Sequence, residues 1–244
     1  IAAAFLFFYP GGYRTLFALS IIPGIAVILI LLRVPEARVN EPPEPVAPPE
    51  PREPTLNLSN SFWKAVLVIL VFSLGNASDA FLLLRITDLG VAPFWIPLLW
   101  SALHVVKVVS SLAGGELSDR LGRRTLIAAG WVVYALVYAG FGYFDSPSTV
   151  IVIFLSYGLY FGLTEGVEKA WVADLAPAGA RGTAFGIYNG ALGVGGLVSS
   201  LMFGVIWTRV SPSAAFFTGA GLAVAATGLL YSLFSHEENP RHQR

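Results

Sequence analysis

The chain has 244 residues, of which 55% are hydrophobic and 12% charged, and its mean hydropathy is +0.70 with no net charge. This apolar content exceeds what a soluble core of this size needs, and it predicts a membrane protein. The balanced charge gives no reason to expect a nucleic-acid partner. Because the chain has no cysteine, it cannot form a disulfide or a thiolate metal site, and we expect neither a metal nor a cofactor.

Seven apolar runs are each long enough to cross a hydrocarbon core of ~30 Å, which takes about 20 helical residues. They cover residues 13–32, 62–84, 94–112, 126–144, 150–173, 183–207 and 214–234. Residues 1–9 are also apolar, but they lack the preceding basic region of a signal peptide. We expect them to be the tail of an earlier membrane helix in a longer protein.

Residues 34–60 separate the first two runs and contain eight prolines and five glutamates. Such a composition favours an extended, polyproline-like cytoplasmic tether without a core of its own. A docking site for a proline-binding domain is the alternative. We therefore divide the chain into residues 1–33, a linker at 34–60, six spans within 61–236 and a cytoplasmic tail at 237–244.

A short basic segment at residues 115–124 fixes the orientation of the spans. Arg120, Arg123 and Arg124 lie close together in it, and Gly115 and Gly122 are expected to bracket a turn. Arginine is costly at mid-bilayer, and short basic loops stay on the cytoplasmic side. With this segment inside, ten lysines and arginines lie on the cytoplasmic side and three outside. The same orientation places the C-terminus in the cytoplasm.

The pattern G-x-L-x-D-R-x-G-R-R in this segment resembles the loop motif of the major facilitator superfamily of secondary transporters; the alternative is a generic basic loop. Its positions are Gly115, Leu117, Asp119, Arg120, Gly122, Arg123 and Arg124. The resemblance implies an all-α, polytopic transmembrane helix bundle whose six-helix C-terminal half is an inverted 3+3 repeat. The first run would be the helix before that half. The N-terminal half of the same protein would then be the missing partner that completes the substrate cavity.

The resemblance also implies a latch at the cytoplasmic mouth. In related transporters an acidic group at the next inner turn pairs with a motif arginine, which we transfer to Asp174 and Arg123, with Asp119 beside them. Asp119 is also suited to capping a helix start, and Arg181 lies in the same inner turn as Asp174. Three glycines that follow at four-residue spacing predict close helix–helix packing: Gly182, Gly186 and Gly190.

Six ionisable residues fall within the runs and away from their ends: Asp79, His104, Lys107, Glu165, Glu168 and Lys169. A charge at such a depth costs roughly 2.5–3.5 kcal/mol on insertion scales, so each should face protein or water and have a partner. We treat these six residues, together with Asn76, as the candidate site for proton and substrate coupling.

Lys107 is expected to lie against Glu165 or Glu168, and the depths favour Glu165. Lys107 lies eight residues from the basic segment and Glu165 nine from Asp174, which gives depths of about 12 and 13.5 Å from the inner turns. Glu165, Glu168 and Lys169 should point within an arc of about 100°, so two lysines and two glutamates would form one neutral set. Such a set is either a structural network or a switchable cluster in which a proton or a charged substrate displaces one partner.

Asp79 has no basic residue three or four positions away, and Asn76 lies one turn before it. Burial disfavours the charged form of such a carboxyl group, so it can carry a proton at neutral pH. Asp79 is therefore a candidate proton carrier, and the alternative is a protonated or Asn76-paired side chain that only packs. His104 is interpreted either as a satisfied core histidine or as a proton relay.

We interpret the protein as a secondary transporter of a small organic solute that works by alternating access in the inner membrane of a bacterium. Its partners would be the solute, protons and the lipid bilayer, and efflux is favoured over uptake. One alternative is a non-transporting membrane sensor on the same fold. Another is an intramembrane enzyme that uses His104 or Glu165, but no H-E-x-x-H, G-x-S-x-G or phosphate-loop motif occurs.

Overall fold

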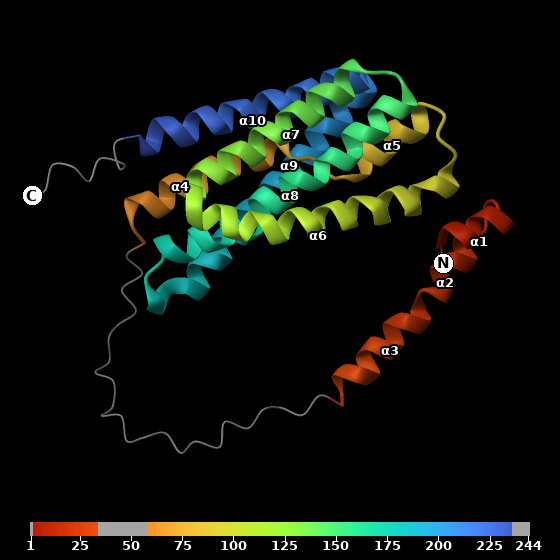
Figure 1. The fold of residues 1–244 in the computed structure, drawn as a ribbon, viewed down its shortest axis with the longest axis horizontal. Helices are drawn as coiled ribbons and strands as arrows, with labels where there is room; N and C mark the ends of the chain where they lie inside the picture. The colour runs from red at the N-terminus through yellow and green to blue at the C-terminus, as the bar shows by residue number, and fades with distance from the viewer. Residues whose placement is uncertain (1, 34–57, 236–244) are drawn as a thin grey trace, which may run out of the picture.

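The computed structural model describes residues 2–33 and 58–235, and every regular element in these two ranges is a helix (Figure 1). The elements are α1 (Ala2–Phe8), α2 (Tyr13–Leu19), α3 (Ile21–Leu31), α4 (Asn60–Gly75), α5 (Ala80–Asp88), η1 (Pro93–Trp95), α6 (Ile96–Leu121), α7 (Arg123–Tyr143), α8 (Pro147–Leu175), η2 (Ala178–Ala180), α9 (Arg181–Arg209) and α10 (Pro212–Phe234). Most of the predicted linker and the whole predicted tail lie outside the described residues.

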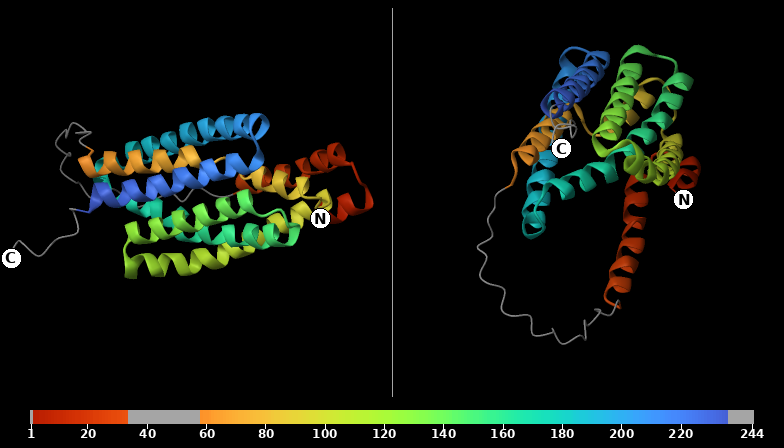
Figure 2. Two further views of the ribbon diagram at one scale, coloured as in Figure 1. Left: turned by 90° about the horizontal axis from the view of Figure 1, so that it is seen from above. Right: turned by 60° about the vertical axis from the view of Figure 1, so that its left-hand side comes forward.

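All seven predicted spans are present as helical segments long and apolar enough to cross a membrane. They are Tyr13–Leu31, Asn60–Asp88, Pro93–Leu121, Arg123–Tyr143, Pro147–Leu175, Ala178–Arg209 and Pro212–Phe234. The all-α, polytopic fold class is therefore confirmed. The first span differs from the rest: α2 and α3 have no buried residue, and Figure 2 shows them running away from the six-span bundle.

The turn predicted at residues 115–124 is much shorter than expected. Helix α6 continues through Gly115 to Leu121 and α7 begins at Arg123, so Gly122 alone links them. Gly122 has φ +85°, a conformation that favours glycine, whereas Gly115 is an ordinary helical residue. The expected bracketing role of Gly115 is wrong, because the polar residues after it continue the helix beyond the apolar run. Asp119 lies in the last turn of α6, and no side chain caps α7.

The second span is interrupted rather than continuous. Helix α4 ends at Gly75 and α5 begins at Ala80, although one apolar run covers both. Asparagine, serine and aspartate side chains compete for backbone hydrogen bonds and so favour helix ends, and residues 76–79 are rich in them. The freed backbone groups find partners on other helices: the Gly75 carbonyl accepts from the Tyr134 hydroxyl at 2.8 Å, and the Ser78 N–H donates to Ser200 Oγ at 3.2 Å.

The packing of the six-span bundle has the symmetry of a repeat. Helices α4 to α7 form a first unit, and α8, α9 and α10 form a second. The middle helix of each unit packs against the first helix of the other unit, α6 against α8 and α9 against α4. The last helix of each unit does the same, α7 against α8 and α10 against α4. Helices α7 and α10, the last of each unit, pack against each other. Since α4 starts at the end of the bundle where α8 finishes (Figure 1), the two units run in opposite directions.

Aromatic side chains fill the centre of this bundle. Phe72 of α4 stacks on Trp131 of α7 with ring centroids 4.6 Å apart, and Tyr134 stacks on Tyr138 at 4.1 Å. All four side chains are fully or almost fully buried. Helices α4, α7, α8 and α10 supply most of the core, whereas α6 and α9 leave long apolar faces exposed.

The predicted glycine stripe on α9 does not pack within the described part of the chain. Gly182, Gly186 and Gly190 face open space among the described residues, so the expected close helix approach at these positions stays a prediction for the complete protein. Close approaches occur at other glycines. Gly114 of α6 lies against the backbone of Gly162 on α8, and Gly195 of α9 lies against Ser73 on α4.

Candidate functional site

The basic motif lies at the end of the bundle where α4, α7 and α9 begin and α6, α8 and α10 finish (Figure 1); we call this end the motif face. Two cations there bind the end of α10. Arg124 donates to the Phe234 carbonyl at 3.0 Å, and Lys64 donates to the Leu233 carbonyl at 3.4 Å. Basic side chains at a helix C-terminus satisfy its last carbonyls and complement its dipole. These contacts join the ends of α4, α7 and α10.

An ion pair at the motif face joins the α6–α7 turn to the end of α8. Arg123 Nε lies 2.5 Å from Asp174 Oδ2, and Arg123 also donates to Oδ1 at 3.5 Å. This is the pairing that the resemblance implies. A second pair, Arg120 with Glu116, lies within the last turns of α6 and is largely exposed.

The third residue expected in the latch, Asp119, does not join this ion pair. Its carboxylate makes no hydrogen bond or ion pair with the residues that the structure describes. It lines, with Arg123 and Gly115, a cavity of about 290 Å³ between α6 and α8. The buried hydroxyl of Ser118 lines the same cavity and has no partner there either. Of the other motif residues, Leu117 is exposed on α6, and Arg181 is exposed at the start of α9.

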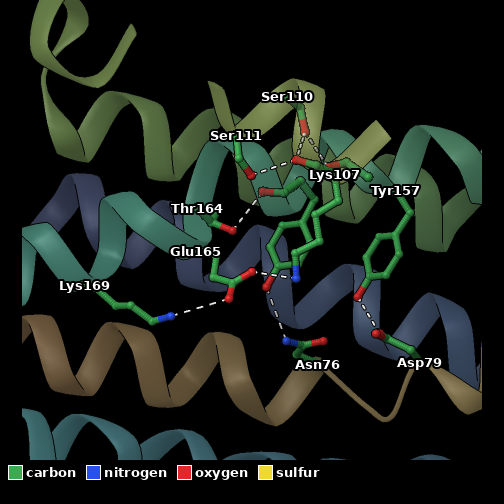
Figure 3. Close-up of polar contacts among 11 residues, drawn as sticks. Asn76, Asp79, Lys107, Ser110, Ser111, Tyr157, Thr164, Glu165 and Lys169 are labelled. Carbon is green, nitrogen blue, oxygen red and sulfur yellow. Dashed lines mark hydrogen bonds and ion pairs between the residues drawn. The ribbon is translucent and has the colours of Figure 1, made fainter. Parts of the chain in front are cut away.

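Three charged side chains meet on the facing sides of α6 and α8 (Figure 3). Lys107 Nζ lies 2.6 Å from Glu165 Oε2, and Lys169 Nζ lies 3.5 Å from Glu165 Oε1. Lys107 also lies over the ring of Phe161, 4.1 Å from its centroid, which is a cation–π geometry. The contact between Lys107 and Glu165 that the sequence depths predict is therefore present.

The depth of Lys107 in its helix differs from the predicted depth. The depth of Lys107 was counted from Gly115 as the helix end, but α6 continues to Leu121. Lys107 therefore lies farther from the end of its helix than the count assumed. The two side chains still meet because α6 and α8 pack closely along much of their length and because lysine has a long, flexible side chain.

Glu168 does not belong to this group, which corrects the expected four-residue neutral set. Its two oxygens accept hydrogen bonds from Trp131 Nε1 at 3.1 Å and from the Tyr188 hydroxyl at 3.2 Å. It is 6% exposed and lies between α7, α8 and α9. Three residues turn a helix by about 300°, which leaves Glu165 and Glu168 about 60° apart around its axis. At the edge of the buried face of α8, this difference places one carboxylate outside and the other in the core.

Asp79 lies at the break between α4 and α5 and is bound by a tyrosine. Its carboxylate accepts a hydrogen bond of 2.8 Å from the Tyr157 hydroxyl, and Asn76 donates to the Tyr160 hydroxyl at 3.4 Å (Figure 3). The alternative of an Asn76-paired aspartate is wrong, because Asn76 turns to α8 instead. The sequence analysis did not assign Tyr157 and Tyr160 as polar partners. Their three-residue spacing on α8 was a signal that could have found them.

His104 lies one turn before Lys107 on α6, but within the described residues it forms no hydrogen bond or ion pair with the other candidate residues. It is exposed on α6, where Nδ1 lies 2.8 Å from the Trp100 carbonyl and the two rings pack at 5.1 Å. His104 is therefore not part of the core of the described chain, and its role in the complete protein stays a prediction. No group of three histidine or acidic side chains that could hold a metal occurs among residues 2–33 and 58–235.

An ion pair at the opposite face was missed by the sequence analysis. Arg85 at the end of α5 lies 2.5 Å from Asp145 in the α7–α8 turn. The arginine side chain is 11% exposed, and its Nε is buried without a partner in the described structure. The pair could not be predicted, because its partners lie sixty residues apart and both fall just outside the predicted apolar runs.

The inverted units, the basic motif and the charged groups on the spans together define a polytopic membrane helix bundle. The chain belongs to the Major Facilitator Superfamily: the model of that family matches residues 1–168 and, in a second register, residues 80–244. The expected family is thus confirmed, and the chain is an integral membrane protein.

Similar proteins carry related names. The chain is 33% identical over 180 residues to an uncharacterized MFS-type transporter of Methanocaldococcus jannaschii, a match that covers 71% of this chain and 45% of that protein. It is 25% identical to a cis,cis-muconate transport protein of Acinetobacter baylyi, covering 93% and 58%. It is 27% identical to a tetracenomycin C resistance and export protein of Streptomyces glaucescens, covering 50% and 23%.

The chain thus spans about half the length of the first two of these relatives. The family and these named relatives are transporters, so the interpretation as an intramembrane enzyme is set aside.

Proposed function

We propose that the complete protein is a secondary transporter that moves a small organic solute by alternating access. The observation that carries this proposal is the group formed by Lys107, Glu165 and Lys169. It lies well within two spans, yet all three side chains are partly exposed. Charges are costly in hydrocarbon, so this side of α6 and α8 must face a cavity or another part of the protein. A six-helix N-terminal half would supply the other wall.

In this proposal the motif face and the C-terminus lie in the cytoplasm, and the membrane is the inner membrane. The excess of lysine and arginine at that face supports this orientation. The Arg123–Asp174 ion pair would close the cytoplasmic side in one state of the cycle and separate in the other.

Protons are the proposed coupling ion, and Asp79 is the proposed carrier. It lies at a helix break, where it has a hydroxyl partner and no ion pair within the described residues. Efflux is the proposed direction. Two relatives support this direction by name, a tetracenomycin C resistance and export protein and a sugar efflux transporter, whereas the name of the cis,cis-muconate transport protein states no direction.

The test is solute flux in proteoliposomes that contain the complete protein and carry an imposed pH gradient. We expect cis,cis-muconate or another small organic solute to move faster than in protein-free vesicles, and the pH gradient to drive it uphill. Flux that does not respond to the pH gradient would show that protons are not the coupling ion. A protein that binds the solute and never moves it would instead be a sensor on the transporter fold.

A further inference from the structure

The charged residues on the facing sides of α6 and α8 are not electrically balanced. Lys107, Glu165 and Lys169, which we call the α6–α8 charge group, are in mutual contact through the two oxygens of Glu165. Two cations therefore share one carboxylate. The carboxylate that would balance them, Glu168, points into the core and is held there by Trp131 and Tyr188.

The remaining nearby carboxylate does not fill this gap. Asp79 lies in the electrostatic field of Lys107, but its oxygen is directed at the hydroxyl of Tyr157 (Figure 3). It contacts neither lysine. An unbalanced cation within a membrane span needs an anion beside it, and among the described residues Glu165 is the anion that both lysines contact.

Both lysines retain the capacity to bind a further acceptor. An ammonium group has three N–H donors, and Lys169 uses one of them in a long contact of 3.5 Å while its side chain stays 53% exposed. Lys107 is held more firmly, by Glu165 at 2.6 Å and by the ring of Phe161. Of the two lysines, Lys169 therefore loses less when an incoming anion replaces Glu165 as its partner.

The surroundings of the charge group are aromatic. Phe161 beneath Lys107 packs against Tyr157 and Tyr160, with ring centroids 4.9 and 5.0 Å apart. On α6, the rings of His104 and Trp100 lie one and two turns, respectively, from Lys107 towards the opposite face. A ligand that binds the ammonium groups would place its body against rings, which favours a flat apolar or unsaturated skeleton.

We propose that the α6–α8 charge group is the binding site for the carboxylate of an organic anion with an unsaturated or aromatic body. The carboxylate of the ligand replaces Glu165 as the partner of Lys169 and accepts a further hydrogen bond from Lys107. The body of the ligand lies against Phe161. This inference rests on the proposed transport function for its cellular role, but the binding step itself can be measured without transport.

The test uses the purified complete protein and matched pairs of probes. The anions are cis,cis-muconate and benzoate, and their uncharged counterparts are muconamide and benzamide. Titration calorimetry and thermal unfolding should show binding of at least one anion and at least ~10-fold weaker binding of its amide, since charge-assisted hydrogen bonds are much stronger than neutral ones. Failure of both anions to bind would overturn the proposal, as would equal binding of the amides.

Four substitutions at three positions assign the binding to these residues. Lys107→Met and Lys169→Met should each weaken anion binding by ~10-fold or more, and Lys169→Arg should keep it within a few-fold. Glu165→Gln should strengthen binding by several-fold, because it removes the competitor of the incoming carboxylate. A purely structural network predicts the opposite for Glu165→Gln, so weaker binding by a folded variant would contradict the proposal. Arg209→Met, which removes one positive charge at the far end of α9, is the control.

Two further measurements separate the remaining explanations. Phosphatidylglycerol and phosphatidylcholine are compared as additives; lysine-dependent stabilisation by the anionic lipid, with none by the carboxylates, would show a lipid-facing surface and overturn the proposal. Flux is measured in the same preparations. Anion binding without flux would refute the proposed transport and leave this site intact. Transport of benzamide that the lysine substitutions do not alter would refute the site and leave transport intact.

Discussion

At the scale of single residues, the Arg123–Asp174 ion pair is the contact most open to a decisive test. Both side chains are partly exposed, so Asp174→Asn should change the free energy of unfolding by less than ~1 kcal/mol. Transport should fall by a much larger factor if the pair closes one state of the cycle. Glu116→Gln, which breaks the neighbouring exposed pair with Arg120, is the matched control.

Asp119 poses a different question, because its carboxylate has no partner in the described part of the chain. We expect Asp119→Asn to leave membrane insertion and thermal stability unchanged and to abolish most transport, since the partner of the carboxylate would form only in the complete protein. Flux is compared with the amount of protein in the membrane. Normal flux in this variant would show that Asp119 is not part of the latch.

For Asp79 the expected result is a separation of two activities. Asp79→Asn keeps an acceptor for the Tyr157 hydroxyl and mimics the protonated carboxyl group, so counterflow should continue while uphill transport driven by a pH gradient fails. Tyr157→Phe removes the same hydrogen bond without removing the carboxyl group and should preserve some proton-driven flux. Equal loss of both activities in Asp79→Asn would assign Asp79 to substrate binding or to folding.

At the scale of helices, the packing of α6 on α8 depends on glycine. A side chain at Gly162 would clash with Ser110 on α6, whereas one at Gly166, a turn later, would meet open space. Gly162→Ala should therefore lower stability by ~1–3 kcal/mol, as overpacking does, and Gly166→Ala should be neutral or stabilising. Thermal unfolding in detergent compares the two. Equal melting temperatures would mean that α6 can move away from α8.

The helices also show where prediction from sequence succeeds and where it ends. The seven spans follow from apolar length alone, and the motif identifies the family because its residues are contiguous. The break at residues 76–79 was missed because an apolar run indicates burial and not helical continuity. The extent of α6 was missed for the converse reason, since its last turns are polar but still helical.

The candidate site was predictable only in part. Lys107 and Glu165 could be paired from depth, because a charge in a membrane needs a partner. The sequestration of Glu168 by Trp131 and Tyr188 could not be inferred, since it depends on how α8 is rotated against α7 and α9. The hydroxyl partner of Asp79 depends on the same rotation.

At the scale of the whole molecule, the orientation in the membrane can be measured directly, because the chain has no native cysteine to mask. Ser146 in the α7–α8 turn and Ser235 after α10 are exposed at opposite ends of the bundle. We expect Ser146→Cys to react with a membrane-impermeant maleimide in intact cells. Ser235→Cys should react only after the membrane is permeabilised, and the reverse pattern would invert the proposed topology.

The one-residue connection at Gly122 has a mechanical consequence for such a molecule. A long loop would let α6 and α7 slide past each other, but a single residue acts as a pivot: it allows their angle to change and prevents an axial shift. If a ligand bound at the α6–α8 charge group moved Lys107, α6 would carry that movement to Gly122 and change the position of Arg123 relative to Asp174. The proposed binding site and the ion pair at the motif face would then be mechanically coupled through α6.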